Sequence, residues 1–134
     1  MLQTARAHRE GGAPVYVYRF DEPATGMDGT LGAAHAVEIP YTFDNLDRRG
    51  VKVLLGEIDD RRRRVAADIA DRWVDFAAGR PLTVPGSEEA WPLHDPTDRR
   101  RVVIGAESHV AEGIDDAAEA LWMVGDRPAG STGS

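Results

Sequence analysis

Residues 14–20 read PVYVYRF, a run of β-branched and aromatic side chains that only Arg19 interrupts. Such a run predicts a strand covered on both faces, as in a parallel sheet between helices, because a half-exposed hairpin strand would alternate apolar and polar residues. A glycine-bearing loop follows over residues 21–34, and loops of this length usually have a functional role. The strand and its loop therefore indicate where a site is to be expected.

The helix with the clearest pattern is predicted over residues 61–78. Four apolar residues recur there at spacings of four, four and three, which gives one apolar stripe. These residues are Val65, Ile69, Trp73 and Phe76. Asp59 or Asp60 is expected to cap the start of the helix, and Gly79 to end it.

Shorter elements are predicted on both sides of this helix. Residues 3–10 have the pattern of the last turns of a helix, and residues 101–104 that of a short strand. A last helix is expected over residues 115–124, and a disordered, Gly-, Ser- and Pro-rich tail over residues 125–134. This order predicts one α/β domain, residues 1–124, whose two strands leave at least one sheet edge open.

Composition excludes several classes of protein. The chain has 134 residues, 16 basic and 23 acidic, and its net charge of −7 argues against a nucleic-acid or anionic-membrane partner. Without cysteine it has no disulfide, no thiolate zinc site and no Cys nucleophile. No apolar run approaches the length of a membrane span, and the start lacks the apolar region of a signal peptide. These features favour the cytoplasm, although a fragment would lack any upstream signal peptide.

His35 is the main candidate for chemistry. It lies at the end of the long loop, just before an apolar segment that is expected to open a helix. Histidine titrates near neutral pH and is therefore the usual general acid or base. The alternative is that His35 merely fills a polar niche, and local features alone favour that alternative.

The stretch PVYVYRFDEP, the loop and GAAHAVEIPYTFDNLD together resemble the C-terminal region of the type-B carboxylesterases, which include the cholinesterases and the bacterial para-nitrobenzyl esterases. The family pattern is a Y-x-Y-x-F strand followed by G-A-x-H-x-x-E-[IL]-x-[YF]-x-F. The matching residues are Tyr16, Tyr18, Phe20, Gly32, Ala33, His35, Glu38, Ile39, Tyr41 and Phe43. DRWVDFAAGRP resembles the family's W-x-x-F-A-x-x-G-x-P run with one residue missing, and WPLHDP its W-P-x-Y-x-P run with His94 in place of tyrosine.

The resemblance, which extends from residue 13 to about residue 104, implies the C-terminal portion of an α/β-hydrolase fold with few strands and an incomplete sheet. His35 matches the histidine of the family's Ser-Asp/Glu-His triad, which takes the proton of the serine hydroxyl and gives it to the leaving alcohol. Glu38 and Gly32 match residues that support the catalytic loop. No cofactor is implied.

The chain contains neither a G-x-S-x-G nucleophile motif nor an HGGG-type oxyanion loop. We therefore expect the nucleophile and the triad acid to lie outside this chain, which is then inactive alone. Its partners would be the missing N-terminal part of the hydrolase and, in the complete enzyme, a carboxylic-ester substrate. A non-enzymatic binding module derived from a hydrolase is the alternative. In a third version, a separate polypeptide supplies the serine half in trans.

Other signals have plain structural interpretations. His35 and Glu38 have the i, i+3 spacing of two metal ligands, but a metal site needs three or four, so no metal is expected. The arginines of residues 61–64 are expected to form a solvated, charge-compensated helix start rather than a nucleic-acid patch. Trp73, Trp91 and Trp122 are expected to pack in the core.

Overall fold

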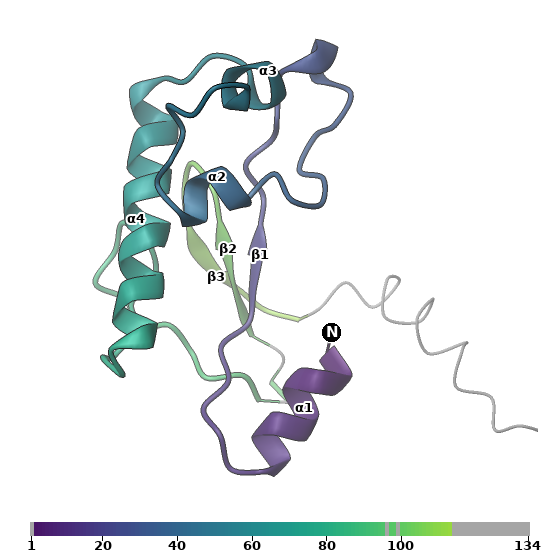
Figure 1. Ribbon diagram of the computed structural model, residues 1–134. Helices are drawn as coiled ribbons and strands as arrows, with labels where there is room; N and C mark the ends of the chain where they lie inside the picture. Colours follow the sequence, from purple (N-terminus) through teal and green to yellow (C-terminus); the bar gives the residue numbers. More distant parts are fainter. Residues whose placement is uncertain (1, 96, 99, 114–134) are drawn as a thin grey trace, which may run out of the picture.

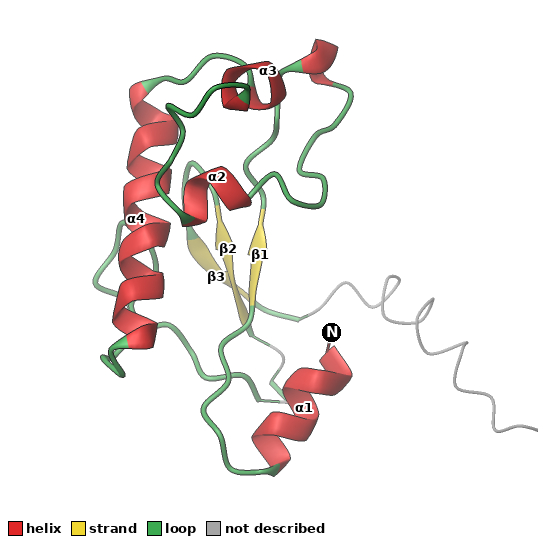
Figure 2. Cartoon of the chain, in the orientation of Figure 1, coloured by secondary structure: helices red, strands yellow, loops and turns green. Residues whose placement is uncertain are grey.

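The computed structural model describes residues 2–95, 97, 98 and 100–113, so the predicted helix over 115–124 and the tail 125–134 lie outside the described residues. Its three strands are β1 (Tyr18–Phe20), β2 (Arg101–Ile104) and β3 (His109–Ala111), in the order β1-β2-β3 (Figure 2). β1 runs parallel to β2, with Tyr18 opposite Val102, and β3 runs antiparallel to β2. The α/β class is thereby confirmed.

The strands differ from the predictions in two ways. β1 is shorter than expected. The extended residues before it still form backbone hydrogen bonds: the Val17 carbonyl accepts from the Val102 amide at 3.1 Å, and the Val15 carbonyl accepts from the His94 amide at 2.7 Å. Within the described residues β1 pairs only with β2 and is half-buried, which agrees with the expectation that at least one edge of the sheet stays open. β3 was not predicted, because three residues are too few to show a strand pattern.

The helices follow the sequence signals closely. α1 (Leu2–Glu10) ends where the Gly11 amide donates to the Ala7 carbonyl at 3.1 Å. α4 (Asp60–Ala77) is capped by Asp59, whose carboxylate accepts from the Arg62 amide at 2.8 Å, and Gly79 follows its end with φ +67°. A 3₁₀ turn η1 (Met27–Gly29) and two short helices, α2 (Ile39–Thr42) and α3 (Val51–Leu55), lie between β1 and α4. α3 was not predicted.

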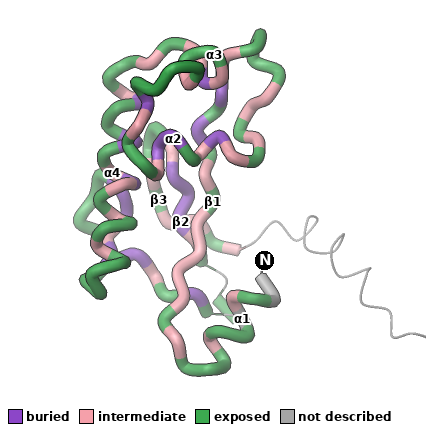
Figure 3. Tube along the Cα trace, viewed as in Figure 1, coloured by how far each residue is buried: buried purple, intermediate pink, exposed green. Residues whose placement is uncertain are grey.

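The core lies between α4, α2 and the sheet (Figures 1 and 3). α4 runs alongside the strands, α2 and α3 lie at the end where β1 terminates, and α1 lies near the opposite end (Figure 1). Buried side chains of α4, α2 and β2 meet there; they include Val65, Ile69, Tyr41, Val102 and Ile104.

The predicted apolar stripe of α4 is buried only in its first half. Val65 and Ile69 are buried, whereas Trp73 and Phe76 remain 43% and 49% exposed although their rings contact Tyr18 and Tyr16 edge to face. Trp91 is buried as predicted, the core prediction for Trp73 is wrong, and Trp122 lies outside the described residues.

Candidate active-site loop

The loop between β1 and α2 is closed across its middle. The Asp21 amide still donates to the Ile104 carbonyl at 2.8 Å, which carries the sheet pairing one residue beyond β1. The Ala24 amide then donates to the Gly32 carbonyl at 2.9 Å. Gly32 has φ +55°, a conformation that favours glycine, so its backbone makes this closure without strain. This contact is consistent with a supporting role for Gly32, which stays a prediction.

His35 lies in the turn formed by residues 35–38, directly before α2, and its side chain is exposed. Its ring makes no hydrogen bond within the described part of the chain. The turn is anchored next to it by Val37, which is 2% exposed and donates its amide to the Ala34 carbonyl at 3.3 Å. Ala36 has φ +70°, a conformation that costs a residue with a Cβ about 1–3 kcal/mol and that surrounding contacts must hold in place.

The turn lies beyond the carboxyl end of β1, where open α/β sheets bind their ligands. The ring of Phe20, the last residue of β1, is centred 5.0 Å from the ring of Tyr41 on α2. Because α2 follows His35 by four residues, this contact holds the His35 turn close to the strand end. The structure thus places His35 where the sequence predicts it, outside any helix.

Glu38 connects the turn to α2 and to β1. Its carbonyl accepts from the amides of Tyr41 (3.1 Å) and Thr42 (2.9 Å), which starts α2, while its carboxylate forms no cap hydrogen bond. Burial, and then the negative charge of Glu38, raise the pKa of Tyr18 on β1. The role of Glu38 in supporting the loop therefore remains a prediction, with its backbone as the clearest contact.

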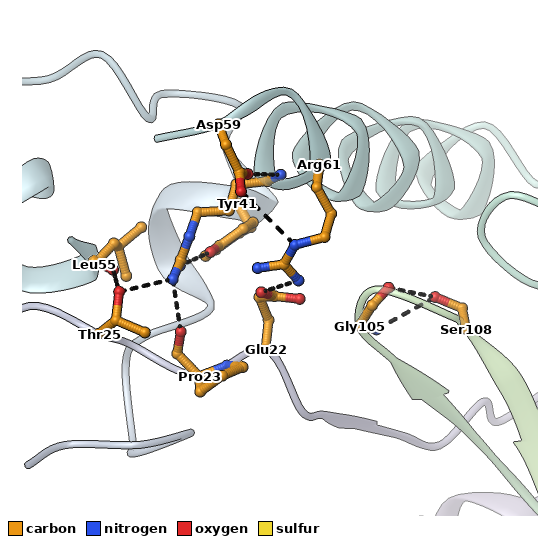
Figure 4. A network of polar contacts seen from close by, with 10 residues as sticks. Glu22, Pro23, Thr25, Tyr41, Leu55, Asp59, Arg61, Gly105 and Ser108 are labelled. Carbon is orange, nitrogen blue, oxygen red and sulfur yellow. Dashed lines mark hydrogen bonds and ion pairs between the residues drawn. The ribbon is translucent and has the colours of Figure 1, made fainter. Parts of the chain in front are cut away.

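Arg62 and Glu22 are the buried charged residues of a polar network that the sequence did not predict; Figure 4 labels Glu22 and the partners of Arg62. Arg62 is 2% exposed, so the prediction of a solvated arginine run is wrong at this position. Its guanidinium donates to the Tyr41 hydroxyl (2.6 Å), the Pro23 carbonyl (3.0 Å) and the Thr25 hydroxyl (3.2 Å). Burial raises the pKa of Tyr41, and Arg62 opposes that rise.

Glu22, the other buried member, is 1% exposed. Its Oε1 lies 2.5 Å from Nη1 of Arg61, an ion pair without hydrogen-bond alignment. A sequence signal for the network exists in the helix spacing: Arg62 precedes the buried Val65, Ala66 and Ile69 by three, four and seven positions, which puts it on the same face of α4.

A second feature is an aromatic groove of about 310 Å³ beside the strand segment, by which we mean the extended residues 14–17 together with β1. We define this groove by five of its lining residues, which are Tyr16, Tyr18, Trp73, Phe76 and Trp91. Their rings meet edge to face, with centroids 6.0 to 6.5 Å apart. Trp91 Nε1 and His94 Nδ1 are buried without a hydrogen-bond partner within the described residues.

Neither a metal site nor a membrane span is found in the part of the chain that the structure describes. Its histidines and carboxylates do not gather in threes around a common point. Its helices are too short or too polar to cross a bilayer.

A parallel strand pair, a long loop that presents a histidine beyond the strand's carboxyl end, and a helix packed on the sheet define a partial domain of the α/β-hydrolase fold. Residues 1–122 match the model of the Carboxylesterase family. The chain belongs to this family, which confirms the resemblance found in the sequence.

Individual relatives agree with this assignment. A carboxylesterase of Geobacillus stearothermophilus superposes with a TM-score of 0.73 at 35% identity, over 91% of this chain and 24% of that one. Phenmedipham hydrolase of Pseudarthrobacter oxydans is 35% identical over 96 residues, 70% of this chain and 19% of that protein. Para-nitrobenzyl esterase of Bacillus subtilis is 31% identical over 100 residues, 71% of this chain and 19% of that protein. The chain thus spans about a fifth to a quarter of the length of these relatives.

Proposed function

We propose that this chain is the C-terminal part of a carboxylic-ester hydrolase and that His35 is its catalytic base. The exposed His35, on a turn anchored beyond the carboxyl end of β1, is the observation that supports this proposal. In an acyl-enzyme cycle this imidazole takes the proton of a serine hydroxyl as the hydroxyl attacks the ester, and then protonates the leaving alcohol. Family membership supports the ester as substrate class.

The other members of the triad are proposed to come from the N-terminal part of the hydrolase, because the chain has no G-x-S-x-G motif. A carboxylate from that part would bind one ring nitrogen of His35 and the serine hydroxyl the other. An exposed ring that forms no hydrogen bond with the described residues suits such an arrangement. The edge of β1 that the described residues leave unpaired and the aromatic groove are the surfaces we propose for this docking.

Replacement of His35 tests the proposal. In the complete hydrolase, His35→Ala should lower kcat for p-nitrophenyl acetate by at least about 10³, as loss of a triad base does. His109→Ala is the matched control, because His109 is also exposed but lies on β3, and it should leave kcat within a factor of about two. A loss of tenfold or less for His35→Ala would make His35 a structural residue.

The 134-residue chain alone should show neither turnover nor labelling by a serine-directed fluorophosphonate probe. Stoichiometric labelling, with a burst of p-nitrophenol, would reveal a nucleophile within this chain and overturn the proposed division of the triad.

The second candidate function is a non-enzymatic binding module, and the exposed aromatic groove favours it. The two candidates differ in what the gene encodes around this chain. A reading frame that continues upstream into G-x-S-x-G supports the hydrolase. A neighbouring frame with that motif supports assembly in trans, and an isolated start with its own ribosome-binding site supports the binding module.

A further inference from the structure

We infer that Arg62 is a positioning residue for His35: its buried guanidinium ties both ends of the loop that carries His35 to the first turn of α4. The inference rests on the proposed function, since positioning matters only if His35 acts as a base.

The start of the loop is held by one side of the guanidinium. Nη2 of Arg62 donates to the Pro23 carbonyl at 3.0 Å and to the Thr25 hydroxyl at 3.2 Å (Figure 4). The Thr25 hydroxyl and the Thr25 amide both donate to the Leu55 carbonyl at 3.0 Å, at the end of α3. The residues that leave β1 are therefore fixed to α3 and α4 at the same point.

The end of the loop is held by the other terminal nitrogen of the same guanidinium. Nη1 of Arg62 donates to the Tyr41 hydroxyl at 2.6 Å, and Tyr41 is fully buried on α2, six residues after His35. Arg62 itself is fixed, because its amide donates to the Asp59 cap at 2.8 Å. One rigid group thus sets the distance between the two ends of the loop.

Only a guanidinium performs this task, because it is planar and offers five donors in a fixed fork, whereas a lysine ammonium is a single point of charge. Within the described residues the hydrogen-bond acceptors of the Arg62 guanidinium are all neutral oxygens, although its charge also acts on the Asp59 carboxylate through space. Each lost hydrogen bond would leave a buried charge less well satisfied and therefore costly, so the guanidinium and the two loop ends hold each other in place. The unfavourable φ of Ala36 between them needs such a frame.

Hydrogen exchange of the 134-residue chain, followed by NMR, tests the inference. In Arg62→Met, the amides of Val37 and Ile39 should exchange at least about tenfold faster than in the wild type, while those of β2 change less than about threefold. Arg62→Lys should restore only part of the protection. Arg63→Gln is the matched control: Arg63 is the next residue of α4, contacts Asp47 on the surface, and should leave the loop unchanged.

If Arg62 only stabilises the fold as a whole, all amides of Arg62→Met should lose protection from exchange together. This outcome overturns the inference. Unchanged exchange of Val37 and Ile39 in Arg62→Met overturns it as well. If Arg62→Met does not fold, Tyr41→Phe decides by the same comparison, because it removes only the hydroxyl acceptor. The result is independent of catalysis: an active His35→Ala hydrolase would contradict the proposed function without changing the exchange pattern of the loop.

Discussion

Arg62 and Arg63 are adjacent residues with opposite environments. Arg63 forms a two-pronged contact with Asp47 at 2.9 and 3.1 Å in which both side chains remain largely exposed. This hydrogen bond lowers the pKa of Asp47, but water and salt screen such a pair, so it contributes little to folding. Arg62 is enclosed by three segments of the chain. Two consecutive residues of α4 therefore differ in role: Arg63 is a surface residue, and Arg62 positions the loop of the proposed site.

The Asp59 cap gives a pH prediction at the same scale. The hydrogen bond from the Arg62 amide is the main cause that lowers the pKa of Asp59 in the folded chain. A lowered folded pKa stabilises the fold above the unfolded value of about 4, and this contribution is lost as the pH falls through the folded pKa. Asp59→Asn keeps a capping oxygen but cannot titrate. Between about pH 5 and pH 3, the denaturation midpoint should fall further in the wild type than in Asp59→Asn. Parallel curves would contradict this prediction.

How far single residues could be predicted depends on whether their partners are local. Asp59 and Asp60 were both predicted as possible caps because a cap bonds an amide only a few residues away, and the structure has Asp59 in this role. His35 was found through its resemblance to a family motif, and its place beyond β1 followed from the strand signal. Arg62 was missed because its acceptors lie 21 to 39 residues earlier in the chain, and a basic run alone indicates a solvated surface.

At the scale of elements, long periodic segments were predictable and short ones were not. The 18 residues of α4 carry a stripe, a cap and a stop signal, whereas α3 has five residues and β3 three. Such short elements exist because neighbours hold them: β3 through pairing with β2, and α3 through its contact with Thr25. β1 is shorter than its apolar run because Val15 pairs with the loop at His94 rather than with a strand.

Gly26 tests how closely the His35 loop packs on α3. A Cβ at Gly26 would clash with the carbonyls of Val53 and Leu54, which are backbone atoms and cannot rotate away. Gly26→Ala should therefore destabilise the chain by about 1–3 kcal/mol, the usual cost of overpacking. Gly105→Ala is the control, since its Cβ would lie 3.8 Å from Asp21, an ordinary contact, and should cost much less. Urea denaturation measures both, and equal effects would show that the loop moves freely off α3.

For the whole molecule, β1 pairs along one edge only within the described residues, and its Tyr18 ring lies against Trp73 in the exposed half of α4. Trp73 and Phe76 of α4 contact Tyr18 and Tyr16 of the strand segment edge to face, so one aromatic surface spans both elements. Apolar surface of this kind beside an open strand edge recruits other chains. In a complete hydrolase we propose that the N-terminal part covers it, and in its absence a second copy of this chain is the available partner.

The isolated chain is therefore expected to self-associate through the aromatic groove, and sedimentation velocity over a range of concentrations measures this. The wild type should show a mass above that of the monomer that rises with concentration. Phe76→Glu should lower the measured mass toward that of the monomer, because burying a carboxylate between two copies of the groove is unfavourable. Val74→Glu adds the same charge on the same helix at a residue that is 58% exposed and outside the groove, so it should leave association unchanged. A wild-type monomer at every concentration, with a two-state melt, would contradict this expectation and favour the binding module over the severed hydrolase.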